Sequence, residues 1–246
     1  MKIVCIIPAR LASRRFPQKV LSRLGDKPLL QWVWEAALSV KQFDVVAFAI
    51  DAVETARLID SFGGRYYLTS PTLPSGTDRL IELRRTQALS GDIWVNWQGD
   101  EPFIYAEMID TLLQKIEPDV SIWSLKKRIE KKEEVDNPNI VKVVTNSVGR
   151  ALYFSRAPIP YNRELSQEIP YYKHIGMYAF TDQALHTLSA LPPSPLEKIE
   201  KLEPLRFLEH GLNIHLHETI HETIGIDVPE DLERASSHHF LRSGVK

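Results

Sequence analysis

The chain has 246 residues, of which 43% are hydrophobic and 25% charged, a composition typical of a globular protein with a substantial core. Its formal net charge of −2 excludes a strongly basic overall field, so we do not expect nucleic acid as a partner. The N-terminal apolar run stops at Pro8 and Arg10, far short of the roughly 20 residues that span a bilayer. The single cysteine, Cys5, excludes an intrachain disulfide. These features predict a soluble, cytoplasmic protein without membrane insertion.

Short apolar runs alternate with segments of helical periodicity in the first half of the chain. We expect strands near 2–7, 45–50, 65–68 and 92–97, and helices over 28–40, 54–62 and 77–89. Such alternation is typical of βαβ units, in which helices cover both faces of a mostly parallel sheet. The predicted fold class is therefore α/β, with a doubly wound, mostly parallel sheet.

The pattern changes after about residue 140. Aromatic, proline-interrupted strands are expected at 151–154 and 171–180, followed by helices near 196–210 and 229–242. We interpret the region from about 140 to 180 as a small dimerisation flap on the same sheet, which makes the chain a single domain, 1–246. The mixed charges from Lys126 to Asp136 indicate a solvated helix face or loop.

A cationic loop follows the first expected strand and precedes the first expected helix. It contains Arg10, Arg14, Arg15 and Lys19. Ligands of open α/β sheets bind at the carboxyl ends of the strands, and clustered cations there suit a polyanion such as a triphosphate. The loop matches neither the Walker motif nor G-x-G-x-x-G. A mobile basic surface loop is the alternative.

Two carboxylates far apart in the sequence are candidate ligands of a metal ion. Asp100 follows the strand near 92–97 and stands beside Gly99, which permits close backbone approach; it is well placed to hold Mg²⁺ near phosphates. Asp227 follows a strand-like segment and precedes a helix, so it is either a second metal ligand or a polar residue at a helix start. The alternating pair His215 and His217 invites a zinc site, which the lack of a third ligand at a recognised spacing disfavours.

Ordered motifs along nearly the whole chain resemble those of the 3-deoxy-manno-octulosonate cytidylyltransferases, also called CMP-Kdo synthetases. The motifs are IIPARLASRRFPQK at 6–19, SGTDR at 75–79, VNWQGDEP at 95–102, NPNIVKVV at 137–144, ALYFSRAPIP at 151–160, KHIGMYAF at 173–180, SPLEKIEKLEPLRFLEHG at 194–211 and IDVPEDLE at 226–233. The resemblance implies a Rossmann-like fold of the nucleotidyltransferase type, a homodimer and Mg²⁺ as cofactor. It also implies a role in lipopolysaccharide biosynthesis.

The resemblance also implies roles for individual residues. The CTP phosphates would be held by Arg10, Arg15 and Lys19. The cytidine would be received by the backbone around Ala9 and by the turn Ser75-Gly76-Thr77. The metal would be bound by Asp100 and Asp227, which act in catalysis together with the three loop cations. The sugar acid would be surrounded by Gln98, Arg156, His174, Tyr178 and Glu203; either Arg156 or His174 could receive its carboxylate.

Two positions depart from the pattern of this family. Gln18 stands where the family usually has glycine. If this position needs a positive φ, glutamine is strained there by about 1 kcal/mol or more, or the loop adopts another path. Pro204 stands inside an expected helix, where the family usually has glutamine. Proline in a helix interior costs about 3 kcal/mol, so we expect a kink or a break near Glu203.

The predicted reaction converts CTP and Kdo, an acidic eight-carbon sugar, into CMP-Kdo and pyrophosphate. The anomeric C2 hydroxyl would attack the α-phosphorus, and positioning and electrostatics would supply most of the catalysis without a dedicated general base. An alternative substrate is 8-amino-Kdo or another sialic-acid-like sugar acid. A non-enzymatic alternative is a CTP-binding sensor on the same scaffold.

Overall fold

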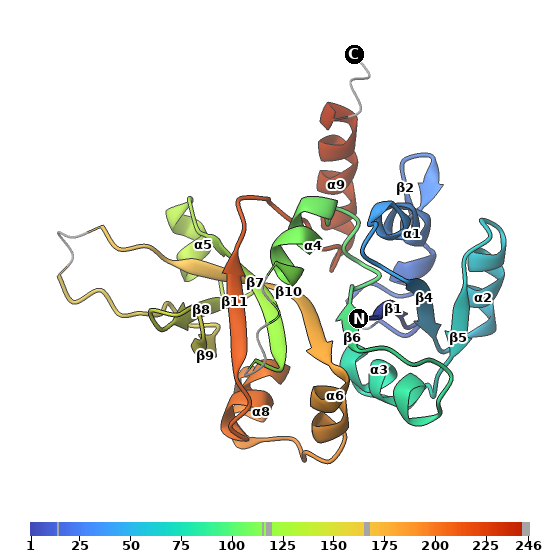
Figure 1. Cartoon of the computed structure of the whole chain (residues 1–246). Coiled ribbons are helices and arrows are strands. Elements are labelled where there is room, and N and C mark those ends of the chain that lie inside the picture. The colour runs from blue at the N-terminus through green and yellow to red at the C-terminus, as the bar shows by residue number, and fades with distance from the viewer. Residues whose placement is uncertain (14, 115, 117–119, 165–167, 243–246) are drawn as a thin grey trace. The chain divides into compact units, whose positions relative to one another are not determined.

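The structure, a computed structural model, describes residues 1–13, 15–114, 116, 120–164 and 168–242, and the order of its elements can be followed in Figure 1. The chain forms two compact units. Unit 1 comprises Met1–Ala106 with Glu222–Lys246, and unit 2 comprises Glu107–His221. The interpretation of residues 1–246 as a single nucleotidyltransferase domain stays a prediction.

Unit 1 contains a parallel sheet. Its strands are β1 (Ile3–Ala9), β4 (Val45–Ile50), β5 (Tyr66–Leu68) and β6 (Ile93–Asn96), in the order β6-β1-β4-β5. All residues of β1 and β6 are buried, as expected for parallel strands that are covered on both faces. The four strands expected from the sequence are confirmed to within two residues at each end.

The helices of unit 1 also follow the expected periodicity. They are α1 (Leu29–Ser39), α2 (Val53–Asp60), α3 (Gly76–Arg85) and α9 (Pro229–Arg242). Helix α1 buries the apolar stripe that predicts it, and α3 ends four residues earlier than expected. The 3₁₀-helix η1 (Lys19–Leu21) and the hairpin of β2 (Arg23–Leu24) and β3 (Lys27–Pro28) were not expected. The turn of this hairpin includes Gly25 with a φ of 62°, a conformation that glycine adopts without strain.

Unit 2 contains a mixed sheet. Its strands are β7 (Ile122–Arg128), β8 (Lys142–Thr145), β9 (Ala151–Ser155), β10 (Tyr172–Thr181) and β11 (Ile214–Glu218). Strands β7 and β11 are parallel, whereas β7–β10, β10–β8 and β8–β9 are antiparallel. Its helices are α5 (Lys132–Asp136), α6 (Asp182–Leu188), α7 (Pro195–Glu200) and α8 (Glu203–Glu209), and α4 (Ala106–Leu113) begins at the unit boundary. The predicted α/β class is confirmed.

The mixed-charge stretch 126–136 is only partly as expected. Its first three residues complete strand β7, and Lys127 is 5% exposed, so the interpretation as a solvated helix face or loop is wrong for this part. Lys127 Nζ lies 3.0 Å from Glu130 Oε1, which keeps its charged end paired at the edge of the protein. Helix α5, in contrast, has no buried residue.

The break expected near Glu203 is confirmed. Helix α7 ends at Glu200, its C-cap Lys201 has a left-handed φ of 55°, and α8 begins at Glu203. Pro204 therefore lies in the first turn of a new helix, where the N–H that proline lacks would have no intrahelical partner. The cost of a proline in a helix interior does not arise.

No helix in the described part of the chain is both long and apolar enough to cross a membrane. Cys5 is buried in strand β1, and burial raises the pKa of its thiol. This residue behaves as a small hydrophobic side chain.

Candidate active site

Three charged side chains that lie far apart in the sequence meet in unit 1. Lys19 Nζ lies 2.5 Å from Asp100 Oδ2 and 3.2 Å from Asp227 Oδ1. Arg15 Nη2 lies 2.9 Å from the same oxygen of Asp227. The Lys19 side chain is 10% exposed, whereas that of Asp227 is 51% exposed. The two carboxylates thus form an electronegative position that holds a positively charged group.

The fold explains why these residues meet. Strands β1 and β6 are parallel neighbours, so the segments that lead to Lys19 and Asp100 leave the sheet at the same edge. The segment before α9 is tied to this edge, because the N–H of Ile226 donates to the carbonyl oxygen of Asp100 at 2.9 Å. Asp231 Oδ2 accepts from the N–H of Asp227 at 2.8 Å, which orders the start of α9.

Glu101 is a further acidic residue at this position, and sequence reasoning assigned it no role. Its Oε2 is buried and has no hydrogen-bond partner within the described residues. Burial, followed by the charges of Asp100 and Asp227, raises the pKa of Glu101 to about 8, and Lys19 acts in the opposite direction. In the sequence, the position of Glu101 directly after Asp100 in the GDEP motif was the feature that could have indicated that Glu101 belongs to the site. Among the described residues, no group of three or more His, Cys, Asp or Glu side chains is arranged to hold a metal.

The turn Ser75-Gly76-Thr77 lies beside the end of β6. Ser75 caps helix α3, since its Oγ accepts from the backbone N–H three residues later at 3.2 Å. A Cβ at Gly76 would lie only 3.0 Å from Gln98 Nε2, so this close approach favours glycine. Gln98 Nε2 donates to Asn96 Oδ1 at 3.0 Å, and Asn96 Nδ2 donates to Thr77 Oγ1 at 3.4 Å. The predicted cytidine turn and Gln98 are therefore neighbours in unit 1.

Gly99 lies directly against the end of β1. Its N–H donates to the carbonyl oxygen of Pro8 at 3.2 Å. A Cβ at Gly99 would lie 2.9 Å from that oxygen and 3.3 Å from the Cβ of Ala9. The close backbone approach that the sequence predicts for Gly99 is confirmed, and it places the predicted nucleotide residue Ala9 next to the GDEP segment.

The cationic loop contains one strained residue. Gln18 has φ 54° and ψ 28°, the left-handed conformation foreseen at this position, and an L-residue there is strained by about 1 kcal/mol or more. Arg10 and Arg15 are exposed, so both remain accessible to an anion, whereas Lys19 is buried. Arg14 lies outside the described residues.

In unit 2, two of the predicted sugar residues are in contact. The ring centroids of His174 and Tyr178 are 5.3 Å apart, and His174 Nε2 lies 2.9 Å from Ser124 Oγ. Burial lowers the pKa of His174 to about 3, so its imidazole is neutral at physiological pH. The pKa of Tyr178 is raised well above its usual value, first by burial and then by the charge of Glu203.

The other two predicted sugar residues of unit 2 are held by local contacts. Arg156 Nε donates to the carbonyl oxygen of Glu200 at 2.8 Å, and its Nη1 donates to that of Pro138 at 2.8 Å. Glu203 Oε1 accepts from Arg206 Nη2 at 2.9 Å. The two carbonyl contacts of Arg156 use part of the five hydrogen-bond donors of its guanidinium group and fix the orientation of that group.

A cationic loop and a carboxylate pair at the carboxyl edge of a parallel sheet define an α/β protein suited to binding a nucleotide polyphosphate and a divalent cation. Comparisons with known proteins specify the class further. The family model of the cytidylyltransferases matches residues 4–220.

Relatives match almost the whole chain. A 3-deoxy-manno-octulosonate cytidylyltransferase of Solibacter usitatus is 45% identical, with 96% of this chain and 93% of the relative covered. One of Thermodesulfovibrio yellowstonii is 47% identical, with 96% and 97% covered. A solved structure of a CMP:2-keto-3-deoxy-manno-octonic acid synthetase in complex with CTP is 38% identical; it matches with a TM-score of 0.93 and covers 98% of this chain and 100% of that one. The chain belongs to the 3-deoxy-manno-octulosonate cytidylyltransferase family.

Proposed function

We propose that this protein transfers the cytidylyl group of CTP to 3-deoxy-D-manno-octulosonate (Kdo) and releases pyrophosphate. The main supporting observation is that Lys19 contacts Asp100 and Asp227. The cationic loop to which Lys19 belongs carries further cations. This arrangement provides positive charge for a triphosphate and acidic oxygens for a divalent cation within one small region. The names of the relatives support the same reaction.

Asp100 and Asp227 would hold Mg²⁺. Their oxygens are the hard ligands that this ion prefers, and the ammonium group of Lys19 at 2.5 Å and 3.2 Å indicates that the pair attracts a cation. Glu101 lies nearby with a buried oxygen that has no hydrogen-bond partner among the described residues, and because its pKa is raised to about 8 it is mostly uncharged at neutral pH. When bound, Mg²⁺ would polarise the α-phosphate and lower the pKa of the attacking hydroxyl.

The residues of the chain would act mainly through charge and position. The C2 hydroxyl oxygen of Kdo forms a bond to the α-phosphorus while the bond from that phosphorus to the bridging oxygen of pyrophosphate breaks, and the hydroxyl proton passes to solvent. Lys19, Arg10 and Arg15 would neutralise the charge that accumulates on the departing pyrophosphate. Positioning by the turn 75–77 would keep the nucleotide in line for this displacement.

We propose sugar contacts for Arg156, His174, Tyr178 and Glu203 in unit 2 and, separately, for Gln98 in unit 1. Because the pKa of His174 is lowered to about 3, its ring has no positive charge to offer a carboxylate at neutral pH. We therefore propose that Arg156 receives the sugar carboxylate and that His174 contacts a neutral group of the sugar.

Pyrophosphate release is the direct test. The purified protein is incubated with CTP and Mg²⁺, and with Kdo, 8-amino-Kdo or a sialic acid in parallel reactions. We expect the highest kcat/KM with Kdo and no release when the sugar is omitted. A much faster reaction with another acid would overturn the substrate assignment. If the protein binds CTP but releases no pyrophosphate in the presence of any of these sugars, the result would support the alternative of a sensor.

We further propose a homodimer that is formed partly by residues 140–180, a cytoplasmic location, where the CTP pool lies, and a role in lipopolysaccharide biosynthesis. Closed dimers are the commonest oligomers of soluble proteins. Sedimentation at micromolar concentration tests the dimer, and a monomer alone would contradict it. Cell fractionation tests the location, and loss of Kdo-containing lipopolysaccharide in a deletion strain tests the role.

A further inference from the structure

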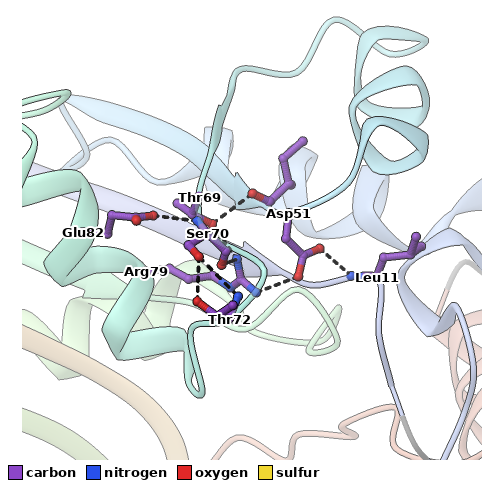
Figure 2. Close-up of polar contacts among 8 residues, drawn as sticks. Leu11, Asp51, Thr69, Ser70, Thr72, Arg79 and Glu82 are labelled. Atoms are coloured by element: carbon purple, nitrogen blue, oxygen red, sulfur yellow. Dashed lines mark hydrogen bonds and ion pairs between the residues drawn. The ribbon is translucent and has the colours of Figure 1, made fainter.

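A buried polar network lies at the carboxyl edge of β1, β4 and β5, as Figure 2 shows. Asp51 follows directly after β4, and its side chain is 5% exposed. One of its oxygens, Oδ2, lies 2.8 Å from Arg79 Nη2. The other, Oδ1, accepts from the backbone N–H of Leu11 at 2.9 Å. One carboxylate thus joins the first part of the cationic loop to a residue of helix α3.

Arg79 is buried and connects two segments of the protein. Its side chain is 2% exposed, so a nucleotide at the surface cannot reach its guanidinium group. Besides Asp51, the group donates to Thr69 Oγ1 and to the carbonyl oxygen of Ser70 at 3.4 Å. Arg79 therefore binds two segments that leave neighbouring strands, β4 and β5.

Helix α3 holds the second of these segments with another side chain. Glu82 Oε2 accepts from the backbone N–H of Ser70 at 2.8 Å. Because Glu82 and Arg79 are three residues apart, they lie on the same face of α3, and both contact the segment after β5 (Figure 2). Helix α3, whose N-cap and first two residues form the turn 75–77, is in this way attached to the sheet edge.

The topology makes this connection relevant to the nucleotide. The parallel pairing of Ala9 with Ile50 and of Ile50 with Leu68 means that the three following segments leave the sheet together. Leu11 is the residue directly after Arg10, a proposed phosphate ligand, and Arg79 follows the proposed cytidine turn by two residues. The Asp51–Arg79 pair is well shielded from solvent and is little weakened by screening.

We propose that Asp51 and Arg79 are positioning residues that fix the cationic loop relative to the turn 75–77. The inference deepens the proposed function, on which it rests for its substrate. Asp51 also neutralises Arg79, so the pair orders the site without adding net charge to it. When the pair is broken, the loop retains its cations but not their arrangement, and binding of the triphosphate weakens.

Kinetics of three variants test this role. We expect Asp51→Ala, Asp51→Asn and Arg79→Lys to raise the KM for CTP by about tenfold while kcat and the KM for the sugar change less than about threefold. Asp51→Asn retains an oxygen for the N–H of Leu11, so its effect should be the smallest of the three.

Asp44→Asn is the matched control. Asp44 Oδ2 accepts from the N–H of Ile3 at 2.7 Å, so it performs the same backbone contact at the opposite end of β1. This variant should leave the KM for CTP unchanged within about twofold. If the Asp51 and Arg79 variants lower kcat through loss of folded protein and leave the KM for CTP unchanged, as a merely structural role requires, the proposal is wrong.

Limited trypsin digestion tests the loop without any substrate. Trypsin cuts after Arg10, Arg15 and Lys19 only when the loop leaves its folded conformation. We expect cutting in the loop to accelerate about fivefold in Asp51→Ala and Arg79→Lys, with cutting at the exposed Lys41 unchanged as the internal reference. Equal loop cutting in wild type and variants would overturn the proposal, even if the wild type releases pyrophosphate from CTP. If the wild type releases none, the proposed function fails, and the digestion still decides whether Asp51 holds the loop. Should Asp51→Ala not fold, Asp51→Asn and Arg79→Lys provide both readouts.

Discussion

Replacement of Glu101 by glutamine should increase stability at alkaline pH in metal-free buffer. The pKa of Glu101 is 4.5 in the unfolded chain and about 8 in the folded protein. Between these values the folded state keeps a proton that the unfolded state has lost, so folding stability falls as pH rises from about 4.5 to 8. Each unit of pKa difference is worth about 1.4 kcal/mol, so the loss is on the order of 5 kcal/mol. Glu101→Gln removes this loss.

The assay is thermal unfolding in EDTA at pH 5 and at pH 9. Asp100 and Asp227 are present in both proteins, so the difference between wild type and variant isolates Glu101. We expect similar midpoints at pH 5 and a midpoint roughly 10 °C higher for the variant at pH 9. Glu54→Gln, at an exposed glutamate of the same unit, is the control and should change stability by less than about 0.5 kcal/mol at either pH. Parallel pH profiles for wild type and Glu101→Gln would refute the reasoning.

Three further predictions concern the metal pair and the two departures from the family pattern. Asp100→Asn and Asp227→Asn should nearly abolish pyrophosphate release while circular dichroism stays unchanged, because Mg²⁺ loses a charged ligand; near-normal turnover of both at limiting Mg²⁺ would remove the metal assignment. Gln18→Val should lower the free energy of unfolding by about 1 kcal/mol, because β-branched residues tolerate φ 54° poorly, and urea titration showing no loss would contradict this. Pro204→Ala should change stability by less than about 1 kcal/mol, because Pro204 lies in a first helical turn. Leu208→Pro, in the last turn of α8, should cost about 3 kcal/mol because proline removes an intrahelical N–H there, and equal effects of the two substitutions would show that the break before Glu203 is misplaced.

The elements of unit 1 could be predicted from the sequence because their signals are local. The apolar run of β1, the helical spacing of α1 and the turn residues between them each act within a few positions. Pro204 likewise indicated a kink or a break near Glu203. The hairpin of β2 and β3 was missed because strands of two residues have no periodicity to detect.

Only part of the site could be predicted from such local signals in the sequence. The cationic loop and the GDEP motif can be recognised locally. The sequence left Asp227 open between a metal ligand and a polar residue at a helix start, and only the structure shows that its oxygen lies 3.2 Å from Lys19 Nζ. Asp51 and Glu101 received no role, since a single acidic residue after a strand is indistinguishable from an ordinary turn residue.

The sequence alone determined the main strands and helices of unit 1, the supply of cations and carboxylates, and the family. Only the tertiary structure decided which charges meet, that the pKa of Glu101 is raised, and that Asp51 connects the loop to α3. The physical reason is that helices and strands follow from contacts a few residues apart, whereas burial and electrostatic interaction depend on distances in space between residues such as Lys19 and Asp227, which are far apart in the chain.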